Sequence, residues 1–387
     1  MASFQKMYIE ICKDVIEDAI AKSGQKVNDS LDLLQLFAIF SLHGKHIVVV
    51  PSLKNDKGLK ERLSKVMMPS NVEKLRRNER ISYKIPAIKS AVTVYCLVTY
   101  AKANQGDDRA IVLNPSRLMK FEPYLESRLI TENLMDAKFF YYIAQSFMRK
   151  KLLTGIKLSY DTKPGGGSTT CDVVRDEIIN PRRFCLVVVD SDKKYPGQPD
   201  YGGTAQKVVD VMAAYPCETC KCYIMEKVME VENLIPKRIV QQYASNKDSC
   251  DILGKDFSYF DMKVGITLKG LFKDEVFTYW EPYMQKEGLD FSGRTDAKNN
   301  STNRTSYERY IDDHGLSNTV KSGFGSDLLR NVTCIPEMNG NVRYPELETE
   351  MCKNIKQEDL TPEQMIEWDN IGKQVFSWTC GLPAISA

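Results

Sequence analysis

The sequence predicts an α/β protein whose core is a parallel sheet covered by helices. Six consecutive apolar residues, Phe184–Val189, are typical of a strand buried on both faces of such a sheet. Expected strands and helices alternate four times between residues 128 and 236, which is the pattern of a parallel sheet with helices on both faces. A chain of 387 residues that is 43% hydrophobic and 27% charged can form a large core and two or three domains.

Composition excludes several classes of protein. The net charge of +2 excludes a globally basic nucleic-acid binder, so any nucleic acid must be contacted by a local patch. With only three histidines, the sequence offers few residues that could form a histidine-based zinc site or a Ser-His-Asp triad, which argues against both classes of hydrolase. Eleven cysteines, an odd number in a chain with no predicted signal sequence, fit reduced thiols. No run approaches 18 apolar residues, so we expect a cytoplasmic protein without a membrane partner.

Residues 1–120 are expected to form a mainly helical accessory domain of mixed α/β type. Apolar residues at helical spacing predict a helix from Phe4 to Ala21, and a second helix is expected over 31–42. Strands are expected at 47–50 and 91–100. Residues 54–84 hold ten Lys and Arg against four acidic residues, which indicates either a phosphate-contacting face or an ordinary solvated helix surface.

Residues 121–245 carry the alternating pattern. A short strand from 128, a helix to about 150, a strand at 156–160 and a helix over 169–179 precede the Phe184–Val189 strand, and a helix at 205–214 and a strand at 221–225 follow it. Three glycines, 165–167, stand before a serine, so the backbone there either approaches a phosphate or forms a tight turn. The segment Cys217–Cys222 is a poor zinc site because no second Cys pair or nearby His completes it. Residues 246–387 are expected to be a mainly helical accessory region.

Acidic residues gather at the ends of these expected strands. Asp190 and Asp192 follow the apolar run and, two positions apart, should point the same way at the carboxyl end of the strand. Such a pair repels unless a cation such as Mg²⁺ or Mn²⁺ lies between the charges. Glu132, with Asp136 in the next helical turn, ends an earlier strand, and Glu230 or Glu232 follows a later one. We expect these carboxylates to converge as two-metal phosphodiester chemistry requires, while a helix cap is the simpler role for Asp136.

Three motifs occur in a recognisable order between residues 126 and 240. They are TENLMDAKFF, then the glycine-rich turn followed by VVVDSD, then EVENLIP. Together they resemble the TOPRIM domain shared by topoisomerases, primases and OLD-family nucleases. The first TOPRIM motif usually reads Glu-Gly, whereas Asn133 stands in the glycine position here. The last motif is similar to the extra acidic element of OLD-type nucleases and related bacterial antiphage effectors.

The resemblance implies a TOPRIM-like Rossmannoid core and a metal-dependent endonuclease. Carried over residue by residue, Glu132, Asp136, Asp190 and Asp192 would bind Mg²⁺ or Mn²⁺, and Glu230 or Glu232 would hold a second ion. Glu132, Asp190 and Asp192 would be catalytic. Lys263 is either an electrophilic partner for the transition state or a surface lysine.

The implied partner is nucleic acid, DNA or RNA and including tRNA, because the metals engage a phosphodiester and no base-reading module is evident. The resemblance also implies defence against phage. For protein partners, the expectation is a separate sensor or ATPase subunit, or further copies of the same chain in a homo-oligomer.

The same residues also allow other functional interpretations. A haloacid-dehalogenase-like phosphatase would place Thr or Val where Lys194 stands, and a glycosyltransferase explains Asp190 and Asp192 but not Glu132 with Asp136. No gate-sized domain or zinc module favours a topoisomerase or a primase. A TOPRIM-like core could also be a non-catalytic scaffold or sensor subunit, or its acidic residues could merely cap helices and contact solvent.

Overall fold

The computed structural model describes residues 7–43, 46–76, 83–101, 107–121, 126–254, 257–333 and 354–382. The chain divides into two compact units. Unit 1 comprises Met1–Val188, Lys207–Tyr223 and Asp369–Ala387, and unit 2 comprises Val189–Gln206 and Ile224–Trp368.

Unit 1 begins with a four-stranded sheet in the order β2-β1-β3-β4, in which all neighbouring strands are parallel. Its strands are β1 (Tyr8–Ile11), β2 (Ile47–Val49), β3 (Tyr95–Val98) and β4 (Ala110–Leu113). The helices around it are α1 (Lys13–Ala21), α2 (Asp29–His43), α3 (Pro51–Asn55), α4 (Lys57–Val66), α5 (Pro69–Leu75), α6 (Ile85–Ala91) and α7 (Pro115–Lys120). Four of them, α3, α5, α6 and α7, have a proline in the first turn, where a missing backbone N–H costs nothing.

The predicted helix from Phe4 to Ala21 is only half present. Residues Lys13–Ala21 are helical, but Tyr8–Ile11 form β1, one of the two inner strands of the sheet. Tyr8, Ile9 and Ile11 are fully buried, which a strand covered on both faces requires and a helix with one exposed face does not. Of the predicted basic stretch, residues 77–82 lie outside the described residues and the remainder lies mainly on α3, α4 and α5.

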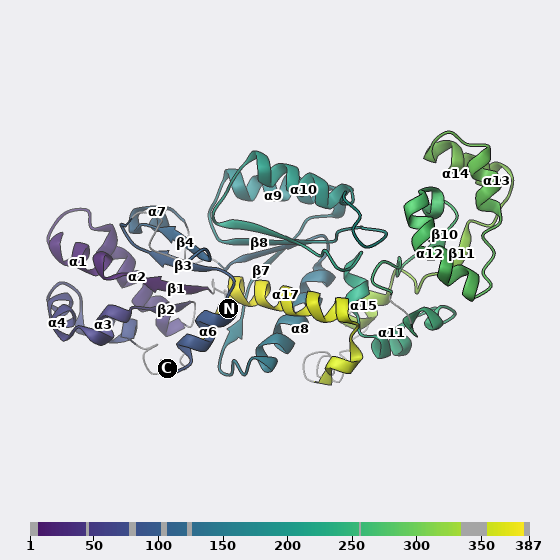
Figure 1. Ribbon diagram of the computed structural model, residues 1–387. Coiled ribbons are helices and arrows are strands. Elements are labelled where there is room, and N and C mark those ends of the chain that lie inside the picture. Colours follow the sequence, from purple (N-terminus) through teal and green to yellow (C-terminus); the bar gives the residue numbers. More distant parts are fainter. Residues whose placement is uncertain are drawn as a thin grey trace, which may run out of the picture. The chain divides into compact units, whose positions relative to one another are not determined.

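A second four-stranded sheet follows along the chain, with the strand order β7-β5-β8-β9. Its strands are β5 (Arg128–Thr131), β7 (Asp161–Pro164), β8 (Cys185–Val189) and β9 (Cys220–Ile224), and its helices are α8 (Leu134–Lys150), α9 (Thr170–Ile179) and α10 (Gly203–Ala214). Strand β5 runs parallel to both β7 and β8, with Ile130 opposite Val187. Figure 1 shows α9 on one face of this sheet and α8 on the other. The prediction of an α/β protein with a parallel sheet is therefore confirmed.

Every residue of β8 is buried, as the apolar run predicted. The strand predicted at 156–160 is displaced, however. Lys157–Leu158 form β6, which pairs antiparallel with β12 (Cys380–Gly381), and it is the polar segment Asp161–Pro164 that pairs with β5. Strand β7 lies at the edge of the sheet, where side chains need not be apolar.

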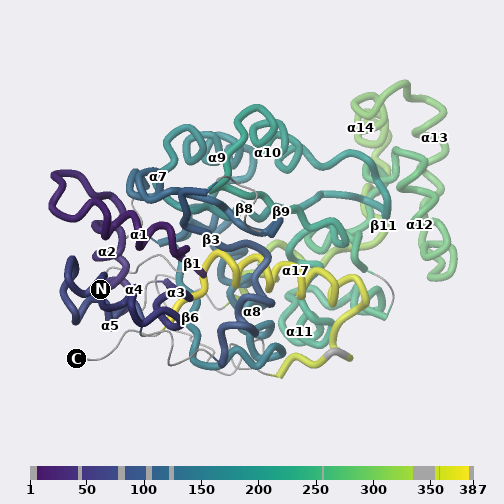
Figure 2. Tube along the Cα trace, turned by 60° about the vertical axis from the view of Figure 1, so that its left-hand side comes forward, coloured from purple at the N-terminus to yellow at the C-terminus, as the bar shows by residue number. Residues whose placement is uncertain are grey.

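Unit 2 holds the remaining elements. Its only regular sheet among the described residues is the antiparallel pair β10 (Gly265–Thr267) and β11 (Thr319–Ser322). The helices are α11 (Lys237–Tyr243), α12 (Asp274–Lys286), α13 (Gly293–Asn299), α14 (Arg304–Asp313), α15 (Leu328–Thr333) and the first part of α17 (Pro362–Thr379). Figure 2 shows α12, α13 and α14 grouped beside β11, and Leu268, Ala297, Tyr307 and Ile311 form a small core there. Within the described parts of the chain, no helix is both long and apolar enough to cross a membrane.

Candidate carboxylate site

Asp190 and Asp192 are held against the segment that follows β9. The Val231 backbone N–H donates to Asp190 Oδ1 at 3.1 Å, and the Asp192 N–H donates to the Met229 carbonyl at 2.9 Å. The Ser191 hydroxyl between them is buried and donates to the Val228 carbonyl at 2.7 Å. These three contacts fix residues 190–192 beside residues 228–231, and therefore bring the Asp-x-Asp motif next to Glu230.

The backbone at Asp192 is strained. Its φ of 54° lies in the left-handed region, which residues other than glycine rarely adopt. Such a conformation costs on the order of 1–3 kcal/mol and persists only where surrounding structure enforces it. Gly202 lies so close that a Cβ there would clash with the Asp192 side chain, and its N–H donates to the Ser191 carbonyl at 2.8 Å. Burial raises the pKa of the Asp192 carboxyl, opposed by the charges of Lys194 and Lys263.

Glu230 and Glu232 lie on either side of Lys263. The ammonium is 3.0 Å from Glu230 Oε2 and 3.1 Å from Glu232 Oε1, and the two glutamate side chains are only 7% and 3% exposed. Burial and the Glu232 charge raise the pKa of Glu230 to about 7. Burial alone would lower the pKa of Lys263, but the charges of Glu230, Glu232 and Asp190 outweigh it and raise that pKa. The lysine is therefore the counter-ion of this acidic group rather than an isolated surface residue.

Local structure explains why Glu230 is buried. It precedes the short 3₁₀ helix Val231–Leu234 and forms a capping box with Asn233, whose Oδ1 accepts from the Glu230 N–H at 2.9 Å. Asn233 also donates to the carbonyls of Phe257 and Phe260, at 2.7 and 2.8 Å. The Met262 N–H then donates to Glu230 Oε1 at 2.8 Å. Two segments far apart in sequence are thus joined at Glu230, which places Lys263 beside it.

Glu132 and Asp136 belong to unit 1. Asp136 completes a capping box at the start of α8 by accepting from the Asn133 N–H at 2.8 Å, as the simpler interpretation of this residue predicted. Glu132 follows β5 and faces the glycine-rich turn. Its carbonyl accepts from the Gly166 N–H at 3.0 Å, and a Cβ at Gly167 would lie 4.0 Å from its carboxylate. Convergence of Glu132 with Asp190 would join the two units and stays a prediction.

The donor chemistry suits a hard divalent cation, since carboxylate oxygens are the ligands that Mg²⁺ and Mn²⁺ prefer. In the described part of the chain, however, no three His, Cys, Asp or Glu side chains are grouped closely enough to hold a metal ion. One visible reason is that the Lys263 ammonium lies between Glu230 and Glu232, where a cation would otherwise neutralise them. A metal ion could bind between Glu230 and Glu232 only if the Lys263 side chain moved away.

Sequence reasoning missed several residues of this site. Asp261 accepts from the backbone N–H groups of Lys263 and Val264, at 3.1 and 2.7 Å, and so orders the turn that carries the lysine. Lys194 lies 3.9 Å from Asp261. In sequence, Asp261 and Lys263 look like residues of an ordinary turn. Their position beside Glu230 becomes visible only in the folded chain.

Comparison with known proteins gives no further guide: no family model, no curated protein and no solved structure matches this chain.

Proposed function

We propose that this protein is a metal-dependent nuclease that cleaves phosphodiester bonds in DNA or RNA. The observation that carries the proposal is the acidic group of unit 2. Glu230 and Glu232 both pair with Lys263, the charges of Asp190 and Asp192 also interact with that lysine, and burial raises the pKa values of Asp192 and Glu230. Partly desolvated carboxylates that lie close together favour binding of a cation.

Each residue has a role in this proposal. Asp190 and Asp192 would hold Mg²⁺ or Mn²⁺, with Glu132 as a further ligand and catalytic residue, and Glu230 and Glu232 would hold a second ion. When bound, the metal would activate water and neutralise charge on the phosphate. Lys263 would then be released from the glutamates and could stabilise negative charge on the phosphate oxygens. Asp136 would support Glu132 by fixing the start of α8 rather than by contacting the metal directly.

Biological context comes only from the resemblance to TOPRIM effectors. We propose a cytoplasmic role in defence against phage, with a separate sensor or ATPase subunit or a homo-oligomer as protein partners. Nothing in the acidic group distinguishes DNA from RNA, since a metal site contacts the phosphate and not the base.

A second candidate is a non-catalytic scaffold or sensor with a TOPRIM-like core. The observation that favours it is the ion pairing of Lys263, because an ammonium that already neutralises Glu230 and Glu232 reduces their need for a metal. In this case Lys263 would be a permanent structural counter-ion.

The experiment that separates these candidates is a cleavage assay. Plasmid, single-stranded DNA and total tRNA are incubated with the wild type, Asp190→Asn, Glu132→Gln and Asp313→Asn, each with and without Mn²⁺. Asp313 is exposed on α14 and is a matched control in unit 2. A nuclease predicts Mn²⁺-stimulated cleavage that only Asp190→Asn and Glu132→Gln abolish, with circular dichroism unchanged. Full activity in either of these two variants would contradict the proposed site.

A further inference from the structure

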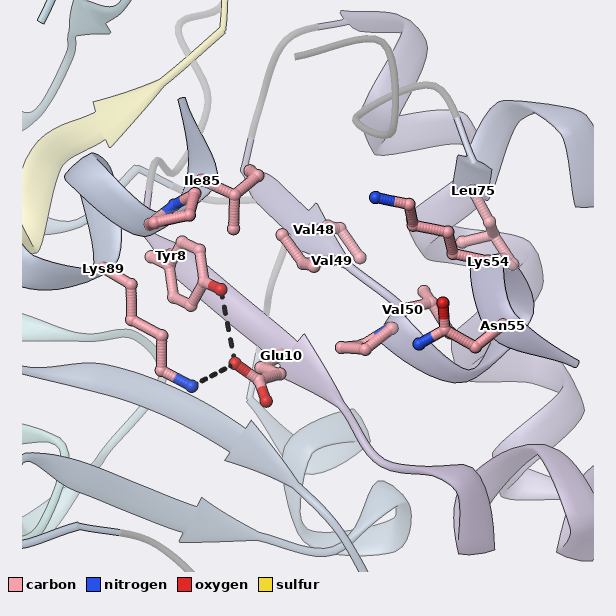
Figure 3. A pocket seen from close by; sticks show the side chains of 12 residues that line it. Tyr8, Glu10, Val48, Val49, Val50, Lys54, Asn55, Leu75, Ile85 and Lys89 are labelled. Carbon is pink, nitrogen blue, oxygen red and sulfur yellow. Dashed lines mark hydrogen bonds and ion pairs between the residues drawn. The ribbon is translucent and has the colours of Figure 1, made fainter. Parts of the chain in front are cut away.

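A pocket in unit 1 lies on one face of the first sheet and shares no lining residue with the carboxylate site. Its volume is about 450 Å³, within the range of small-molecule sites. Valines 48, 49 and 50 of β2 and the following turn form its floor, and α3, α5 and α6 contribute its walls (Figure 3). The pocket is next to the carboxyl end of β2, which is where open parallel sheets commonly bind ligands.

One wall carries a charged side chain on an inner strand. Glu10 of β1 lines the pocket with its carboxylate turned toward Tyr8 and Lys89 (Figure 3), and its side chain is 19% exposed. The Lys89 ammonium lies 2.6 Å from Glu10 Oε2, and the Tyr8 hydroxyl donates to the same oxygen at 3.2 Å. Both partners hold the carboxylate in one orientation. In the described part of the chain no hydrogen bond reaches Oε1, so this oxygen can accept from a ligand.

The opposite wall carries hydrogen-bonding groups of another kind. Lys54 and Asn55 form the end of α3, and Figure 3 shows the Lys54 side chain extending toward the middle of the pocket. Both are exposed. No ion pair of Lys54 occurs within the described residues, so its charge can neutralise an anion.

We propose that this pocket binds an adenine nucleotide. The valine floor, with Leu75 and Ile85, would contact the faces of the base. The exocyclic amine at position 6 of adenine would donate to Glu10 Oε1, and the phosphate would pair with Lys54. Asn55 can hydrogen-bond the ribose.

The geometry of Glu10 favours adenine over guanine. Guanine presents two N–H donors in parallel and pairs best with both oxygens of a carboxylate. Oε2 of Glu10 already accepts from Lys89 and Tyr8, which leaves Oε1 as the oxygen for a ligand donor and hinders pairing through both oxygens. A single exocyclic amine fits this arrangement. Hypoxanthine, which has a carbonyl oxygen at position 6, would place an acceptor against the carboxylate if it bound in the position proposed for adenine, and would have to shift to bring its N1–H to Oε1.

The test compares AMP, IMP and adenosine by isothermal titration calorimetry on the full chain. AMP and IMP differ only at position 6 of the base and in the neighbouring ring proton, so their ratio reports the Glu10 contact. The wild type is expected to bind AMP about tenfold more tightly than IMP, which corresponds to one lost hydrogen bond. This site is independent of the proposed nuclease activity, so the two ideas can fail separately.

Four variants complete the experiment. Glu10→Gln, which can turn an amide donor toward the ligand, should remove the preference for AMP over IMP. Lys54→Met should weaken AMP about tenfold and leave adenosine unchanged, whereas Lys57→Met, on an exposed lysine outside the pocket, should change neither. Val49→Phe should fill the floor and abolish binding. Absence of AMP binding at about 1 mM, equal affinity for AMP and IMP, or unchanged binding in Lys54→Met and Val49→Phe would overturn the proposal.

Discussion

The two four-stranded sheets of this chain have the same strand order but different environments for their acidic residues. Numbered along the chain within each sheet, both β2-β1-β3-β4 and β7-β5-β8-β9 read 2-1-3-4. In the first, Asp14 just beyond β1 accepts from the Thr99 hydroxyl at 2.6 Å and the Tyr100 N–H at 2.8 Å, and Glu10 pairs with Lys89. In the second, Asp192 follows β8 with a strained backbone, and the buried Glu230 and Glu232 after β9 both pair with Lys263.

The comparison shows what topology does and does not decide. In both parallel sheets, acidic residues lie near the carboxyl ends of the strands. Whether they attract a cation depends on the partners that the rest of the chain supplies: Glu10 pairs with Lys89, whereas the buried Glu230 and Glu232 share Lys263. The following predictions test this difference, beginning with the largest effect.

The first prediction compares the two counter-ions. Lys263→Met should reduce the free energy of unfolding by about 3 kcal/mol, because it leaves two buried carboxylates without their cation. Lys89→Met should cost about 1 kcal/mol, since Glu10 keeps the Tyr8 hydroxyl and is more exposed. Urea denaturation at pH 7 measures both values. Equal losses in the two variants would remove the distinction between the sheets.

The second prediction concerns the strained backbone at Asp192. Gly202→Ala should destabilise the protein by about 2 kcal/mol, because the new methyl group would clash with the Asp192 side chain. Gly203→Ala is the matched control, since a Cβ at Gly203 meets nothing within 4 Å. Thermal unfolding should show a lower Tm for the first variant only. Similar Tm values for the two variants would mean that Asp192 adapts without strain.

The third prediction is a pH dependence next to the site. Burial alone would raise the pKa of Glu226, but hydrogen bonds from Lys193, at 2.5 Å, and Tyr201 outweigh it and lower this pKa. A lowered carboxyl pKa contributes stability above its unfolded value, about 4.3, and this contribution disappears as pH falls through the folded value.

Glu226→Gln should therefore cost about 1 kcal/mol at pH 7 and nearly nothing near pH 2. Glu287→Gln, on an exposed residue at the end of α12, should show no such trend. Urea unfolding curves across this pH range provide the measurement, and a pH-independent difference for Glu226→Gln would argue against the ion pair.

Much of the fold could be predicted because its signals are local. The apolar run of β8 and the alternation of strands and helices are visible in sequence. Strand β1 was missed because Tyr8 and Ile11 also fit helical spacing and the strand has only four residues. Strand β7 was missed because an edge strand carries polar side chains, such as Asp161 and Lys163. The shared strand order of the two sheets leaves no repeat in sequence, since packing rather than residue identity determines it.

The site could be predicted only in part. Asp190, Asp192, Glu230 and Glu232 are visible as acidic residues near strand ends, and the structure brings them into one unit. The arrangement of Lys263 and Gly202 could not be foreseen, because it depends on which backbone segments meet through Asn233 and Ser191. Contacts of this kind join residues far apart in sequence and leave no periodic pattern.

The most direct test of the account is a titration of Mn²⁺ followed by electron paramagnetic resonance, which distinguishes free from bound ion. The account predicts that the wild type and Asp313→Asn bind Mn²⁺, that the double variant Asp190→Asn, Asp192→Asn does not, and that Lys263→Met binds more tightly than the wild type because its glutamates are unneutralised. Unchanged binding in the double variant, or no binding by the wild type and Lys263→Met alike, would contradict a metal site at these carboxylates.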